Sequence, residues 1–194
     1  KLPDLRCTLD GTYWWASIKT TDIAAGLPAG FDGDYHGARY HFVLHDITRT
    51  PAYNLLNRGR TLQDPAAHWV ETSNPYGNSR LVNHKRFNWK STLWRIPGWE
   101  FMNIYQLHAK RFTDRHQDLL PLDRVVKEIE NGYFDRCGIT AIQLLPVNEF
   151  SGENGWGYNG TYFYAIENGF GGPDALKRFV DTCHSNGIAV ILDA

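Results

Sequence analysis

The sequence predicts a β-rich first half followed by an α/β second half built on a parallel sheet. In residues 1–100, short runs of aromatic and β-branched residues alternate with clusters of turn-forming residues, a pattern typical of short antiparallel strands. After Pro97-Gly98, apolar runs of strand length alternate with segments whose apolar residues recur at helical spacing. The chain has 194 residues, 42% of them hydrophobic, which is enough to bury a core.

Residues 1–100 are predicted to form a small β-sandwich. The segments Thr12–Lys19 and Ala38–Asp46 are predicted strands, and the connection between them includes GLPAGFDGDYHG, which is dense in turn formers. Further turn signals follow at residues 63–65 and 74–77. Short strands separated at this spacing are typical of two packed antiparallel sheets.

Residues 101–194 are predicted to form a β-α-β-α-β unit. The expected elements are a strand at Asn103–Ala109, a helix at Leu122–Gly138, a strand at Ile139–Val147, a helix from Pro173 to Gly187 and a strand at Ile188–Leu192. Gly138 is expected to cap the first helix and Asn186-Gly187 to close the second, while Pro173 suits a first helical turn. Strands connected through helices run parallel, so a parallel sheet follows.

Two histidines of this half are expected to be structural. His184 falls in the last turn of the second predicted helix, where a cation or a capping donor is favourable. His108 lies in the first predicted strand, and its position favours a buried, hydrogen-bonded ring.

The long connection Asn148–Gly172 holds the features that point to a ligand. Connections of this kind usually take ~2–6 residues, and longer ones tend to be functional. This one leaves the carboxyl end of a parallel strand, the side on which such folds bind ligands. Phe163 and Phe170 are expected to pack inward. Other side chains could stack on a sugar ring or meet its hydroxyl groups: Trp156, Tyr158, Tyr162, Tyr164, Asn148, Glu149, Glu153 and Asn159.

A nucleotide site at the same connection is disfavoured. Gly169, Gly171 and Gly172 precede a helix, and helix amino ends attract anions. However, GFGGP matches neither GxGxxG nor GxxxxGK followed by Ser or Thr, and it lies far from its strand. The glycosylation sequon Asn159-Gly160-Thr161 is interpreted as a chance occurrence, since a glycan there would block a sugar site.

Composition argues against several other classes of function. The net charge is −1 and the basic residues form no block, so no nucleic-acid partner is expected. No apolar run approaches the ~20 residues of a membrane helix, so no membrane partner is expected. Cys7, Cys137 and Cys183 show no metal or redox spacing and favour a reducing compartment such as the cytoplasm. The start KLPDLRCTLDG is no signal peptide and lacks Met, so we expect the native start to lie upstream.

Four segments together resemble the α-amylase superfamily, glycoside hydrolase family 13: IYQLHAKRFT, GITAIQLLPVNEF, WGYNGTYFYA and FGGPDALKRFVDTCHSNGIAVILDA. Within that superfamily the chain is most similar to branching enzymes, isoamylases and maltooligosyltrehalose trehalohydrolases. The resemblance is specific over residues 103–194 and looser over the first hundred. It implies a β-sandwich of the glycogen-binding type over residues 1–100, followed over residues 101–194 by strands one to three of a (β/α)₈ TIM barrel.

The resemblance also implies a set of substrate-binding residues. Tyr158 matches the tyrosine that stacks beneath the sugar next to the scissile bond, and Asn159 falls where a polar neighbour contacts the same sugar. Trp156 belongs to the same motif, and Asp193 matches an aspartate of the first signature region that supports the site. None of the family's three catalytic acids has a match, so no catalytic residue is expected within this chain. Glu149 and Glu153 match no catalytic position.

The implied activity is retaining glycoside chemistry on an α-1,4-glucan such as starch, glycogen or a maltooligosaccharide, by hydrolysis or by branching and transfer. We therefore expect the chain to be the N-terminal part of a longer enzyme and inactive by itself. No metal site or cofactor is expected here, because the Asn that would serve the family's calcium lies beyond the last residue. The alternative is a non-catalytic starch- or glycogen-binding module that uses Trp14 or Trp15 as its platform. A complete small nucleotide-binding protein is a third, less favoured hypothesis.

Overall fold

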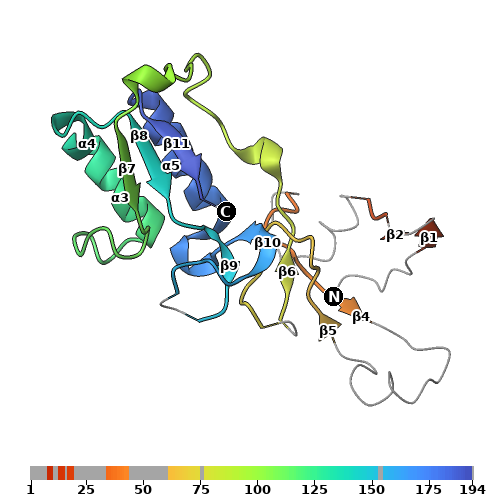
Figure 1. The fold of residues 1–194 in the computed structure, drawn as a ribbon. Helices are drawn as coiled ribbons and strands as arrows, with labels where there is room; N and C mark the ends of the chain where they lie inside the picture. The colour runs from red at the N-terminus through yellow and green to blue at the C-terminus, as the bar shows by residue number, and fades with distance from the viewer. Residues whose placement is uncertain are drawn as a thin grey trace.

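A three-stranded parallel sheet organises the second half of the chain (Figure 1). The computed structural model describes residues 8–10, 13–15, 17–19, 34–43, 61–74, 77–152 and 155–193. Its central sheet consists of β7 (Ile104–Leu107), β8 (Ala141–Leu144) and β11 (Ala189–Leu192), in the order β11-β8-β7. Both pairings are parallel, which confirms the sheet predicted from the alternation of strands and helices.

Three helices follow or connect these strands, and one of them departs from the prediction. The single helix expected over residues 122–138 is divided into α3 (Pro121–Glu130) and α4 (Tyr133–Arg136). The break lies at Gly132, whose φ of 71° is left-handed and cannot continue a helix. Helix α5 (Gly172–Ser185) has Pro173 in its first turn and is followed by Asn186-Gly187, as predicted.

The helices and the sheet share one apolar core. Arg178 of α5 forms an ion pair with Asp123 of α3 at 2.8 Å, and Figure 1 shows both helices alongside the sheet. Phe134 of α4 is fully buried within an aromatic cluster that includes Tyr105 and Phe112. The other fully buried large side chains of this core are Leu122, Val125, Ile142, Leu144, Phe179 and Cys183.

The connection between β8 and α5 is not the irregular loop that the sequence predicts. It contains an antiparallel hairpin of β9 (Asn148–Phe150) and β10 (Gly160–Ile166), followed by the 3-10 turn η3 (Asn168–Phe170). The hairpin register shifts between its three residue pairs, so the strands are bulged. Residues 151–152 and 155–159 therefore belong to the tip of a hairpin, and its two strands orient that tip.

The described residues of the first half include six very short strands: β1 (Thr8–Asp10), β2 (Tyr13–Trp15), β3 (Arg39–Tyr40), β4 (Phe42–Val43), β5 (Thr61–Leu62) and β6 (Ser79–Arg80). They form three antiparallel pairs, β1 with β2, β3 with β6 and β4 with β5. The strand predicted at 12–19 is shorter in the structure, and the one predicted at 38–46 is interrupted at His41, with residues 44–46 outside the described residues. The β-sandwich itself stays a prediction.

The segment that links the two halves is attached to α5. It contains the 3-10 turns η1 (His84–Arg86) and η2 (Trp99–Phe101). The carboxylate of Asp181 accepts hydrogen bonds from the backbone N–H groups of Lys90 and Ser91 and from the Ser91 hydroxyl. The ring of His184 stacks on Trp94, with centroids 3.8 Å apart. The structural role predicted for His184 is thus confirmed, but as a stacking partner, and burial lowers its pKa rather than favouring a cation.

None of the helices in the described part of the chain combines the length and the apolar character that a membrane crossing requires.

Replacing Phe134 with alanine is expected to lower the free energy of unfolding by about 3–5 kcal/mol, because it removes a fully buried ring from the aromatic cluster. A urea titration followed by tryptophan fluorescence measures the change. Phe163→Ala, at a ring that is 73% exposed, is the matched control and should alter the value by less than about 0.5 kcal/mol. Equal losses in the two variants would contradict this description of the core.

Candidate functional site

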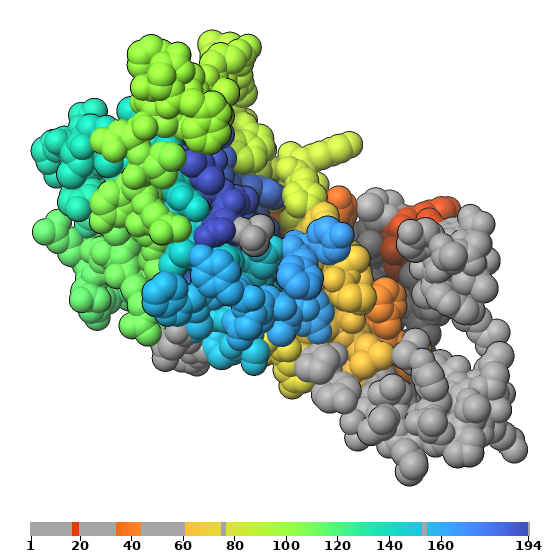
Figure 2. All heavy atoms as spheres, in the orientation of Figure 1, coloured from red at the N-terminus to blue at the C-terminus, as the bar shows by residue number. Residues whose placement is uncertain are grey.

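The candidate site lies at the carboxyl ends of the parallel strands, where the hairpin tip crosses the sheet. Asp193 directly follows β11, and its backbone N–H donates to the Leu144 carbonyl at 3.1 Å, next to the end of β8. The chain leaving β8 runs into β9, so the hairpin begins at the same edge of the sheet. Figure 2 shows the hairpin segment on the surface, between the sheet half and residues 61–80.

Tyr158 and Asp193, two of the predicted site residues, are in direct contact. The Tyr158 hydroxyl donates to Asp193 Oδ2 at 2.7 Å. This hydrogen bond raises the pKa of Tyr158 above its ordinary value, with burial as a smaller cause. The Tyr158 side chain is otherwise open, because the residue remains 61% exposed. The ring is therefore held at its hydroxyl end and free to meet a ligand with its face.

The hairpin tip is also held from beneath by His108, the residue after β7. The backbone N–H of Lys110 donates to His108 Nδ1 at 3.1 Å, so the ring proton lies on Nε2 and donates to the Gly155 carbonyl at 3.0 Å. The ring is half-buried rather than buried, and the hydrogen bonding predicted for it is confirmed.

Gly157 places the tip against the chain that leaves β8. Its φ is 91°, and a Cβ on this residue would lie 2.4 Å from the Pro146 carbonyl oxygen. Only glycine fits this approach. The residues on either side, Trp156 and Tyr158, are both exposed.

The remaining aromatic residues divide differently from the prediction. Phe170 is buried against His108 and Phe150, as predicted. Phe163 was expected to pack inward, and that prediction is wrong because the residue is 73% exposed. Tyr162 and Ala165 occupy the buried positions of β10, and Phe163 is left on its exposed side.

Two carboxyl groups lie at the base of the hairpin, those of the buried Glu149 and the half-buried Glu167. The sequence predicted that Glu149 could meet a sugar hydroxyl, and it pointed to no role for Glu167. Glu149 is only 3% exposed, and its Oε2 accepts the backbone N–H of Asn168 at 2.9 Å. Burial raises the pKa of Glu149 from 4.5 to about 7, the Asn168 hydrogen bond opposes this, and the negative charge of Glu167 adds to it. Burial also raises the pKa of Glu167. Glu149 lies at the base of the hairpin because β9 pairs with β10. The sequence did not predict this pairing, so it could not predict the burial of Glu149.

The other candidate residues are placed as follows. Asn159 is exposed on the tip beside Tyr158, and Glu153 lies outside the described residues. Gly171 and Gly172 adopt positive φ angles at the tight turn into α5.

Within the described ranges, no three side chains of His, Cys, Asp or Glu are grouped so that they could hold a metal ion. Cys137 is exposed, and Cys183 is buried in the core, where burial raises the pKa of its thiol.

This arrangement is suited to a polyhydroxylated ligand. Trp156 and Tyr158 provide open aromatic faces, and Asp193 and Asn159 provide oxygen and amide groups beside them. Flat apolar faces with a few convergent polar groups are what a sugar ring requires.

Glu149 makes stability depend on pH in a defined direction. The pKa of Glu149 is higher in the folded state than in the unfolded chain, so the folded state binds the proton more tightly and stability falls as pH rises from about 4.5 through about 7. Glu149→Gln is expected to flatten this part of the curve of Tm against pH, while keeping an acceptor for Asn168. Glu130→Gln, at an exposed carboxylate of α3, is the control. A Glu149→Gln curve with the parent slope would contradict the prediction.

Comparison with known protein families gives a match at the same part of the chain. Residues 106–194 match the family described as alpha amylase, catalytic domain. The malto-oligosyltrehalose trehalohydrolase of Arthrobacter ramosus is 40% identical over 114 residues, which are 59% of this chain and 19% of that protein. The trehalohydrolase of Saccharolobus solfataricus is 31% identical over 157 residues, 81% and 24% of the two chains. A 1,4-alpha-glucan branching enzyme of Pseudoalteromonas atlantica is 33% identical over 139 residues, 67% and 19%.

Solved structures agree with these relatives. A crystal structure from Salmonella typhimurium, of a protein described as a candidate alpha amylase, superposes with a TM-score of 0.68 at 31% identity, over 83% of this chain and 24% of that one. A pullulanase from Anoxybacillus in complex with maltotetraose gives a TM-score of 0.55 at 27% identity, over 70% and 24%. The chain spans about a fifth to a quarter of the length of the curated relatives it matches. Residues 106–194 of this chain belong to the α-amylase catalytic-domain family, with a partial TIM-barrel fold.

Proposed function

We propose that this protein is an α-glucan-active glycosidase or transglycosidase in which residues 101–194 form strands one to three of the catalytic barrel and one wall of the sugar site. The observation that carries the proposal is the Tyr158–Asp193 hydrogen bond of 2.7 Å at the carboxyl end of β11. It holds an exposed aromatic ring at the edge where barrel enzymes bind their substrates.

The proposed roles follow from the chemistry of each group. The face of Tyr158 stacks on one sugar ring, with Trp156 beside it on the same tip. Asp193 accepts the Tyr158 hydroxyl through Oδ2, which leaves Oδ1 for a sugar hydroxyl. Asn159 adds an amide that can both donate and accept. In a retaining mechanism one carboxylate attacks the anomeric carbon while another carboxyl protonates the leaving oxygen, and no residue of this chain is assigned either role.

The proposed substrate is an α-1,4-glucan: starch, glycogen or a maltooligosaccharide. The names of the relatives, trehalohydrolase of malto-oligosyltrehalose and 1,4-alpha-glucan branching enzyme, support this class. Pullulanase structures that hold maltotriose and maltotetraose support it as well. Water as the acceptor would give hydrolysis, and a sugar hydroxyl would give branching or transfer.

We also propose that residues 1–100 form a β-sandwich domain ahead of the barrel. Three antiparallel strand pairs in this part of the chain support the proposal. The platform role suggested for Trp14 and Trp15 concerns side chains outside the described residues.

Replacing Tyr158 with alanine in the protein expressed from its complete gene is expected to weaken maltoheptaose binding about tenfold to a hundredfold, as for a central aromatic anchor. Tyr158→Phe keeps the ring but loses the Asp193 hydrogen bond, so it should fall between the parent and the alanine variant. Calorimetric titration measures the affinities. Trp99→Ala, at an exposed ring of the linking segment, is the control. Parent affinity in Tyr158→Ala would contradict the proposed function.

The 194-residue chain produced by itself is expected to release no sugar from starch or glycogen, because the family resemblance places the nucleophile and the acid/base on later strands. A reducing-sugar assay measures this, with the protein from the complete gene as the positive comparison. Turnover by the 194 residues alone would contradict the assignment of the catalytic acids to later strands.

A further inference from the structure

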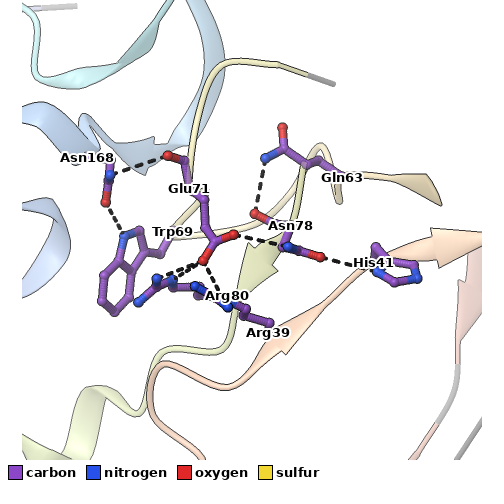
Figure 3. A network of polar contacts seen from close by, with 8 residues as sticks. All are labelled: Arg39, His41, Gln63, Trp69, Glu71, Asn78, Arg80 and Asn168. Carbon is purple, nitrogen blue, oxygen red and sulfur yellow. Dashed lines mark hydrogen bonds and ion pairs between the residues drawn. The ribbon is translucent and has the colours of Figure 1, made fainter. Parts of the chain in front are cut away.

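One residue, Asn168, connects the first half of the chain to the base of the hairpin (Figure 3). The Trp69 indole Nε1–H donates to Asn168 Oδ1 at 2.9 Å, and Asn168 Nδ2 donates to the Glu71 carbonyl at 3.3 Å. The backbone N–H of Asn168 donates to Glu149 Oε2 at 2.9 Å. Asn168 therefore bonds on one side to residues almost a hundred positions earlier and on the other side to β9.

Trp69 is held in place by its own surroundings. The Arg80 guanidinium lies 4.7 Å from the centroid of the Trp69 ring, in a cation–π arrangement. A Cβ on Gly172 would come within 3.3 Å of Trp69 Nε1, so the indole lies directly against the start of α5. In Figure 3, Arg80 and Arg39 both bond to the carboxylate of Glu71. Burial opposes ionisation of Glu71, but hydrogen bonds from Asn78, Arg80 and Arg39 outweigh it and lower its pKa.

The same two parts of the chain also share a small apolar core. Ala67 and Val70 are buried together with Tyr162 and Ala165 of β10. The inner side of the hairpin thus packs on the segment that carries Trp69, while its tip carries Trp156 and Tyr158. The hairpin is supported at its tip by the parallel sheet and at its base by residues 67–71.

We propose that Asn168 is a positioning residue, through which the Trp69 segment orients the hairpin and so sets the affinity for glucan. This inference rests on the proposed function. Asn168 acts through Glu149 and β9 and is not assigned a contact with the sugar. Without its bond to Trp69, the tip keeps its supports at Asp193 and His108 but samples more orientations, and binding must then order it. The expected effect is on KM rather than on kcat, since the reacting groups lie elsewhere.

The test is a double-mutant cycle in the protein expressed from its complete gene, with maltoheptaose as the substrate. Trp69→Phe keeps an aromatic ring and removes the N–H donor together with the five-membered ring of the indole. Asn168→Ala removes the acceptor and also the amide donor to the Glu71 carbonyl. Each variant is expected to raise KM about three- to tenfold, which corresponds to the free energy of about one hydrogen bond. The kcat should stay within about twofold of the parent. The double variant should be no worse than Asn168→Ala alone, because that substitution already removes the bond to Trp69. Trp99→Phe is the matched control.

Hydrogen–deuterium exchange gives a second readout that needs no sugar. Peptides covering residues 155–160 should exchange faster in Trp69→Phe than in the parent, while peptides covering β8 should be unchanged. Parent KM and parent exchange in Trp69→Phe would overturn the proposal, as would a double variant whose losses add, or a fall in Tm without a change in KM. If Tyr158→Ala also shows the parent KM, the proposed function itself fails. If only the Trp69 and Asn168 variants match the parent, the function stands and the positioning role is lost.

Discussion

The candidate site depends on the pairing of β8 along both of its edges. The same four residues, Ala141–Leu144, pair with Ile104–Leu107 on one side and with Ala189–Leu192 on the other. The three strands therefore end level, with His108 and Asp193 as the first residues beyond the two outer ones. Neighbouring strands lie ~4.8 Å apart, so these two residues stand on lines ~10 Å apart.

That spacing accounts for how the hairpin tip is held. The tip bonds to His108 through the Gly155 carbonyl and to Asp193 through the Tyr158 hydroxyl. Three extended residues span ~10 Å, so the segment from Gly155 to Tyr158 can cross the end of β8 from one outer strand to the other. It passes so close to Pro146 that Gly157 has no room for a side chain. The neighbouring residues Trp156 and Tyr158 are thereby left facing solvent.

The sequence predicted the parallel sheet well because each of its strands is a short apolar run between turn signals, and it predicted α5 because the chain carries both of its end signals. It missed the hairpin because GTYFYAI has aromatic residues on both sides, and two register shifts remove the alternation that would reveal a strand. The prediction for Phe163 was wrong for the same reason, because β10 was not recognised as a strand. Asn131-Gly132 was a readable signal for the break between α3 and α4. Tyr158 and Asp193 are 35 residues apart in the sequence, and no local spacing predicts their contact. The long aromatic connection already pointed to Tyr158, and the family resemblance gave both residues a place in one site.

The carboxyl groups of the buried Glu149 and the half-buried Glu167 satisfy backbone groups at the base of the hairpin. Two acids in an apolar base oppose folding at neutral pH. However, a backbone N–H at a strand irregularity or in the first turn of a helix needs an acceptor outside the regular hydrogen-bond pattern. Glu167 accepts the N–H of Gly169 at 2.9 Å and that of Phe150 at 3.3 Å, and Glu149 accepts the N–H of Asn168. The two carboxylates thus accept backbone N–H groups of β9 and of the first turn of η3. Glu149, whose carboxyl group makes stability depend on pH, therefore holds the backbone N–H of Asn168. The side chain of Asn168 bonds with Trp69 instead.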